Sequence, residues 1–144
     1  MQPQALADAA QLIAQHVAAG TRVERLPERC RPRNRAEGYA VQAEVVQLLG
    51  ERPLGWKIAA TSVAGQKHIN VDGPLAGRLL ANRVFAAGSE AANAIDLRGN
   101  LLRVAEAEFA FRMAHPLPPK ANGQTYAVAE VMAAVDTLHL AIEV

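Results

Sequence analysis

Residues 101–113 read LLRVAEAEFAFRM, and within this stretch apolar and polar side chains alternate with a period of two. One face of the alternation would carry Ala105, Ala107, Phe109, Phe111 and Met113. The other face would carry Val104, Glu106, Glu108, Ala110 and Arg112. Successive side chains of a β-strand point to opposite sides, so this pattern predicts a half-buried strand.

Glu106 and Glu108 would be neighbours on the polar face of that strand, roughly 6.5 to 7 Å apart along the chain. Two carboxylates this close repel each other, so they need water, a basic partner or a cation between them. A hard divalent cation such as magnesium suits them because it prefers oxygen ligands. The other interpretation is a solvated strand face that carries two exposed glutamates.

Composition limits the classes of protein that the chain can belong to. The 144 residues are enough for one domain with a hydrophobic core, and 51% hydrophobic residues argue against disorder. A net charge of +1 gives no reason to expect a nucleic-acid or membrane partner. The N-terminus lacks a signal-peptide pattern, no apolar run approaches 18 residues, and the single Cys30 has no disulfide partner. We therefore expect a cytoplasmic protein.

Helical spacing of apolar residues predicts three helices, over residues 4–19, 34–50 and 125–138. Gly20 and Gly50 follow the first two and are natural helix ends. Asn34 can cap the second helix, with Glu37 three residues later in the position of a capping box. Thr125 can cap the third helix, whose buried stripe would be Val128, Val131, Met132, Val135 and Leu138.

The segment between the second helix and residue 101 predicts short strands and turns. Residues 55–62 indicate a strand in which Lys57 is a lone charge, directed either to solvent or to a site that holds an anion. Residues 62–70 predict a short helix or an irregular turn. Residues 82–85 and 95–97 predict further extended pieces. Gly77, within residues 75–80, is consistent with a close approach of the backbone to another group.

Six arginines lie between positions 22 and 35: Arg22, Arg25, Arg29, Arg31, Arg33 and Arg35. Such a cluster is usually a solvated face. It could instead help to attract a small anionic substrate.

Six short motifs in order make the chain resemble the fumarylacetoacetate hydrolase superfamily, in the branch of 2-keto-4-pentenoate hydratases and 4-oxalocrotonate decarboxylases. The motifs are Tyr39-Ala40-Val41-Gln42, Gly55-Trp56-Lys57-Ile58 with Thr61-Ser62, Gly73-Pro74 followed by Gly77, Glu106-Ala107-Glu108, Leu117-Pro118, and Ala141-Ile142-Glu143. The resemblance covers nearly the whole chain.

The resemblance implies an α+β fold, a mixed β-roll or open barrel with an N-terminal pair of helices. Residues 1–144 would form a single domain that is incomplete at its C-terminus. Within it, residues 1–50 would be the helical portion, and residues 51–144 would begin the β-roll and carry a metal site. Family members are homo-oligomers when full length, so the resemblance implies an oligomer as well.

The resemblance further implies a magnesium or manganese ion held by Glu106, Glu108 and Glu143. The activity would be that of a lyase, a hydratase of small 2-oxo acids that acts through a metal-stabilised enolate. Lys57 matches the family's lysine and would pair with the substrate carboxylate or move a proton. The candidates for substrate contact are Ser62, Gln66, Gly73 and Gly77.

Two departures from the family pattern leave alternatives open. Leu75 stands where hydratases of this branch carry an acidic residue, which favours a 4-oxalocrotonate-type decarboxylase or an acylpyruvate hydrolase as the alternative activity. The chain also ends in mid-pattern after Glu143. We therefore keep a hypothesis of another class, a non-catalytic truncated remnant or a subunit completed by a partner chain.

Overall fold

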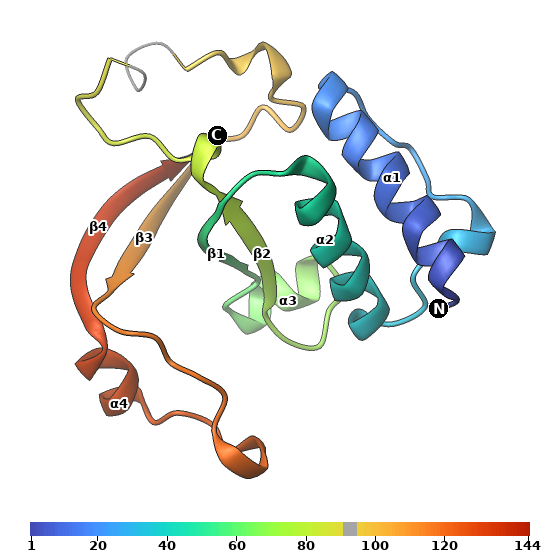
Figure 1. Ribbon diagram of the computed structural model, residues 1–144. Helices are drawn as coiled ribbons and strands as arrows, with labels where there is room; N and C mark the ends of the chain where they lie inside the picture. Colours follow the sequence, from blue (N-terminus) through green and yellow to red (C-terminus); the bar gives the residue numbers. More distant parts are fainter. Residues whose placement is uncertain (91–94) are drawn as a thin grey trace. The chain divides into compact units, whose positions relative to one another are not determined.

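The computed structural model describes residues 1–90 and 95–144, which form two compact units, Met1–Gly99 and Asn100–Val144 (Figure 1). The first unit contains α1 (Pro3–Ala19), α2 (Arg35–Leu49), β1 (Pro53–Ala59), α3 (Val63–His68) and β2 (Leu75–Leu80). The second contains β3 (Glu106–Met113), α4 (Val128–Ala133) and β4 (Val135–Glu143). Each unit is considered by itself. The prediction of one domain over 1–144 stays a prediction.

Both units combine helices with a two-stranded antiparallel sheet, β1 with β2 and β3 with β4. The α+β class predicted from the sequence is therefore confirmed. Over the described residues the strands do not form a closed barrel, and both strand pairs are antiparallel rather than mixed.

The N-terminal helix pair forms as the sequence predicts. Gly20 ends α1 and Gly50 ends α2, each with a positive φ (63° and 67°) that a residue without a Cβ adopts at little cost. The side chain of Asn34 caps α2 by accepting a hydrogen bond from the Glu37 N–H at 2.9 Å.

Glu37 does not complete the predicted capping box. Its carboxylate accepts the N–H of Arg33 at 2.8 Å, and it also pairs with the N-terminal ammonium group at 2.5 Å. These hydrogen bonds, that of the ammonium group first, lower the pKa of Glu37 to about 2. The capping glutamate therefore also ties the start of α1 to the start of α2.

The core of the first unit lies between α1 and α2 and consists of small residues: Ala9, Ala10, Ala14, Cys30, Val41 and Val45. Helices approach each other to a distance that the contacting side chains set, so alanines permit close packing. Cys30 is 1% exposed and its thiol donates to the Pro27 carbonyl, so this cysteine is packed in the core. The apolar residues Val17 of α1 and Leu48 of α2 are exposed.

α2 protects the outer edge of β2. The Ala76 N–H donates to the Tyr39 hydroxyl at 3.1 Å, and the Gln42 side-chain amide donates to the Ala76 carbonyl at 3.1 Å. Two side chains three positions apart on a helix thus satisfy backbone groups that a third strand would otherwise pair. This contact gives the Tyr39-Ala40-Val41-Gln42 motif a structural role.

The second unit corrects the prediction of a helix over 125–138. Only Val128–Ala133 is helical, Ala127 rather than Thr125 is the N-cap residue, and Val135 and Leu138 belong to β4. Two β-branched residues, Val135 and Thr137, favour a strand at this point. The alternation from Thr137 to Glu143 then continues that strand to the end of the element.

The structure corrects two smaller predictions, the extended pieces over residues 82–85 and 95–97. Residues 81–83 form a turn of 3-10 helix, so the extended piece predicted over 82–85 is wrong at Asn82 and Arg83, whereas Val84 has extended backbone angles. A second 3-10 turn, Leu97–Gly99, replaces the strand predicted around Ile95-Asp96-Leu97, and the earlier part of that connection, residues 91–94, lies outside the described residues. The side chain and the backbone N–H of Arg98 donate hydrogen bonds to the Asp96 carboxylate, and these lower the pKa of Asp96.

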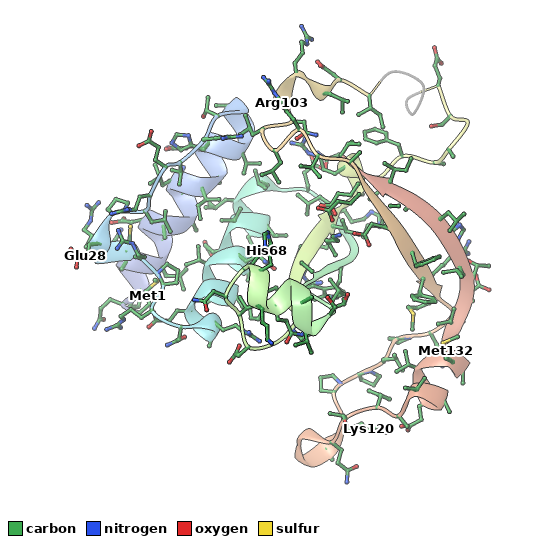
Figure 2. The ribbon with its side chains drawn as sticks, turned by 180° about the vertical axis from the view of Figure 1, so that it is seen from behind. Met1, Glu28, His68, Arg103, Lys120 and Met132 are labelled. Atoms are coloured by element: carbon green, nitrogen blue, oxygen red, sulfur yellow. The ribbon has the colours of Figure 1, made fainter. Side chains whose placement is uncertain are left out.

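The loop before α4 is closed by an ion pair, in the part of the second unit where Figure 2 labels Lys120 and Met132. Lys120 donates to Glu130 at 2.6 Å, and the carboxylate of Glu130 also accepts the Ala127 N–H. The lysine first, and then that N–H, lower the pKa of the Glu130 carboxyl. The Tyr126 hydroxyl donates to the Pro118 carbonyl at 2.6 Å and fixes the same loop.

Candidate metal centre

Strand pairing brings together the three glutamates singled out in the sequence. β3 and β4 run antiparallel with Glu106 opposite Glu143 and Glu108 opposite Ala141. Directly opposed residues share a face of the sheet, and so do residues two apart on one strand. Glu106, Glu108 and Glu143 therefore lie on one face at one end of the hairpin.

The carboxylates of these glutamates are close enough to share a ligand. One oxygen from each lies within 4.8 Å of the others. Glu106 and Glu143 are exposed, and Glu108 is half-buried. The chain thus supplies three ligand atoms from two adjacent strands, a scaffold that is stiffer than a loop.

The donor set fits a hard divalent cation. Mg²⁺ prefers carboxylate oxygens at about 2.1 Å and normally keeps some positions for water or substrate. Ligand oxygens around such an ion lie about 3 to 4 Å apart, so the side chains need only small rotations to reach it. The metal-binding role of the three glutamates stays a prediction.

The opposite face of the β3–β4 hairpin is apolar. Cross-strand pairs place Phe109 beside Leu140 and Phe111 beside Leu138. The alternation of the stretch is as predicted, but the face is not half-buried: Phe109 is 69% and Leu140 83% exposed. The hairpin therefore separates a polar face with the glutamates from an exposed apolar face.

The polar face continues away from the glutamates. The next cross-strand pair is Ala110 with His139, and the following one is Arg112 with Thr137. The Thr137 hydroxyl and His139 Nε2 lie 2.9 Å apart in a hydrogen bond. Arg112 pairs with Asp136 at 3.3 Å, beside the β-bulge at Arg112–Met113. This ion pair gives Asp136 a partner on the same strand pair.

Lys57, the predicted catalytic residue, lies in the first unit. It is half-buried on β1, opposite Gly77 of β2. The alternation predicted for this strand is present, with Lys57 on one face and Trp56 and Ile58 on the other. The apolar face is the more exposed one, and there the Arg78 guanidinium stacks 3.5 Å from the centre of the Trp56 ring.

Ser62 and Gln66 make local contacts that account for their residue types. The Ser62 hydroxyl caps α3 by accepting the Gly65 N–H at 3.0 Å. The Gln66 side chain donates to the Ala60 carbonyl at 3.0 Å, where Ala60 has a φ of 55°. Both side chains hold the turn that follows β1, so substrate contact by either stays a prediction.

Gly73 and Gly77, the two glycines predicted to contact substrate, have different surroundings in the first unit. A Cβ on Gly77 would meet its nearest described neighbour, the Lys57 carbonyl oxygen, at 4.0 Å, which is an ordinary contact. The close backbone approach expected at Gly77 is therefore not seen within the first unit. Gly73 lies against the Arg35 guanidinium, which would be 3.5 Å from an added Cβ.

Most arginines of the basic cluster have partners within the first unit. Arg29 pairs with Asp8 at 3.6 Å, and Arg33 pairs with Glu37 at 3.2 Å. Arg35 pairs with Asp72, and Arg31 donates to the Leu26 carbonyl. A groove of about 600 Å³ runs beside Arg33 and Arg35. These pairs favour a structural role for the cluster over the attraction of an anion.

His139 and Thr137 are the residues of the polar face that the sequence interpretation missed. The signal was present as an alternation of Thr137, His139, Ala141 and Glu143. It was hidden because residues 125–138 were assigned to a helix, which put Thr137 and His139 outside any strand face.

Comparison with known proteins adds no family to these observations. No family model matches the chain, and no curated protein matches it. Among the described residues, no helix is long and apolar enough to cross a membrane.

Proposed function

We propose that the chain carries the metal site of a divalent-metal-dependent lyase that acts on small 2-oxo acids, as in 2-keto-4-pentenoate hydratases. The observation that supports it most is the set of three carboxylates within 4.8 Å on adjacent strands. The resemblance of the six motifs assigns the same three residues. The proposal includes the finer fold, a fumarylacetoacetate hydrolase-like β-roll, and a homo-oligomeric cytoplasmic enzyme.

Each residue has a distinct part in the proposed chemistry. Glu106, Glu108 and Glu143 would hold Mg²⁺ or Mn²⁺, which when bound polarises the 2-oxo group as a Lewis acid. The resemblance gives Lys57 the part of pairing with the substrate carboxylate or moving a proton. The resemblance gives Ser62, Gln66, Gly73 and Gly77 as the candidates for substrate contact.

The reaction itself has three candidates within this class. Leu75, half-buried at the start of β2, replaces the acidic residue expected of a hydratase. Decarboxylation of a 4-oxalocrotonate-type acid and hydrolysis of an acylpyruvate are therefore the alternative activities. The products distinguish the three reactions: hydration gives a hydroxylated acid, decarboxylation releases carbon dioxide, and hydrolysis gives two shorter acids.

A partner-completed or non-catalytic subunit is the second candidate, and the exposed apolar face of the hairpin favours it. That face includes Phe109, Phe111, Leu138, Leu140 and Ile142. Contiguous exposed apolar surface of this kind usually marks a contact with another protein segment. Such a subunit would retain the glutamates as a remnant of the enzyme.

Metal binding at the three glutamates should stabilise the folded chain. A ligand that binds only the folded state at a hundredfold excess over its Kd stabilises it by about 2.7 kcal/mol. We expect millimolar Mg²⁺ or Mn²⁺ to raise the melting temperature of the unmodified chain, and Glu106→Gln or Glu143→Gln to abolish the rise. Differential scanning calorimetry with and without metal measures it.

Glu24→Gln is the control, since it removes one exposed negative charge from the loop between α1 and α2. It should leave the metal-induced rise intact. A rise that persists in the glutamate variants would show that the metal binds elsewhere and would refute the site. A turnover assay with 2-oxo acids then tests the activity, and it should depend on metal and on Lys57.

A further inference from the structure

We propose that His139 determines substrate specificity by binding the end of the 2-oxo acid that is remote from Glu106, Glu108 and Glu143. The inference rests on the proposed function, because it takes the glutamate cluster as the place where the 2-oxo end is held. It adds a requirement for an oxygen acceptor, such as a second carboxylate, at the other end of the substrate.

The register of the hairpin sets the distance between the two ends of this site. Glu108 is opposite Ala141, and His139 is two residues from Ala141 on the same strand. Residues in this diagonal relation have Cα atoms roughly 7–8 Å apart and share a face. His139 is thus one step along the polar face from Glu108, the nearest of the three carboxylates, and two steps from Glu143 on the same strand.

The side chains between the carboxylates and the imidazole of His139 are small. Ala110 lies opposite His139, and Ala141 lies opposite Glu108, so the two residues between the carboxylates and the imidazole have only methyl side chains. A ligand held at the glutamates can therefore lie flat over these alanines. A larger side chain at position 110 or 141 would occupy the surface over which the ligand lies.

The hydrogen bond with Thr137 holds the imidazole of His139 through Nε2, and the proposed tautomer is the one in which the hydroxyl is the donor. Thr137 Oγ1 lies 2.9 Å from His139 Nε2. When the threonine hydroxyl donates to Nε2, the ring proton stays on Nδ1, which is then a hydrogen-bond donor. The next cation along the face, Arg112, is paired with Asp136. His139 is therefore the nearer donor for the remote end of the ligand.

The test compares two six-carbon acids of equal length, 2-oxoadipate and 2-oxohexanoate, by calorimetric titration into the Mn²⁺-loaded chain. A hydrogen bond to a charged group is worth about tenfold or more in affinity. We expect His139→Ala to weaken binding of 2-oxoadipate about tenfold and to leave 2-oxohexanoate unchanged. Thr137→Val should produce part of the same selective loss.

Arg112→Gln is the matched control, since it removes a cation from the same strand face one step further on. It should not alter the ratio of the two affinities. If His139→Ala weakens both acids equally, or neither, while Mn²⁺ still binds, the inference about His139 is wrong and the proposed function stands. If Mn²⁺ does not bind to the unmodified chain, the proposed function and this inference both fail.

Discussion

At the scale of single residues, Glu37 shows how one side chain joins two elements. It lies in the first turn of α2, and its side chain is only 14% exposed. Its carboxylate accepts hydrogen bonds from the N-terminal ammonium group and from the Arg33 N–H, which is why its pKa falls to about 2.

Glu37→Gln should therefore destabilise the fold in a manner that depends on pH. The folded pKa of about 2 lies below the ordinary value of 4.5, so the stabilisation is complete above pH 4.5 and is lost as pH falls toward 2. We expect the melting temperature of the variant to lie below that of the unmodified chain at pH 6 and to converge with it near pH 2. Thermal melts across this range measure the difference.

Acetylation of the N-terminal amine is the companion experiment, because it removes the ammonium partner and leaves the Arg33 contacts in place. It should reproduce part of the loss at pH 6. If the melting temperatures of Glu37→Gln and the unmodified chain differ by the same amount at pH 6 and at pH 2.5, the assigned pKa of Glu37 is wrong.

At the scale of elements, the contact between α1 and α2 depends on small side chains. Ala9 and Ala10 are completely buried, and Ala14 is nearly so. Alanine offers little apolar area, so the stability of this contact comes from close packing rather than from large buried side chains.

Ala10→Leu should therefore be strongly destabilising. Extra methyl and methylene groups in a close-packed core force side chains and backbone to shift, at a cost of about 1–3 kcal/mol. Chemical denaturation measures the change in the free energy of unfolding. Ala18→Leu makes the same substitution at an exposed position of α1 and should change stability by less than about 0.5 kcal/mol. Equal effects at the two positions would show that the helix contact is not close-packed.

At the scale of the whole molecule, the two units differ in how they are stabilised. The principal core, from Ala9 to Val45, belongs entirely to the first unit. In the described part of the second unit, Ala134 is the only buried hydrophobic residue. The second unit consists mainly of one strand pair, and an isolated two-stranded hairpin is marginally stable in water at best.

We accordingly expect residues 1–99 expressed alone to melt cooperatively, and residues 100–144 alone to show no cooperative transition. Circular dichroism of the two fragments against temperature distinguishes them. A cooperative melt of residues 100–144 that is unaffected by Mn²⁺ would mean that the hairpin is stable without a partner or an ion. Its exposed apolar face would then need another explanation.

Alternation and helix-ending signals made much of the fold predictable from the sequence. Helices α1 and α2, their glycine ends, the Asn34 cap and the β3 strand all follow from local rules, because each depends on residues within one or two turns of chain. The helix predicted over 125–138 failed because apolar residues there suit either period, and pairing with β3 selected the strand.

The amino-acid sequence by itself determined that Glu106 and Glu108 could serve as ligands, because side chains two positions apart on a strand lie on the same face. Only the tertiary structure decided that Glu143 lies opposite Glu106, because the antiparallel register joins residues 37 positions apart in the chain. The same register put His139 on the face of the glutamates and left the aromatic side chains of β3 on the other. Local rules specify the face of a strand, whereas the partner across it is specified by long-range pairing.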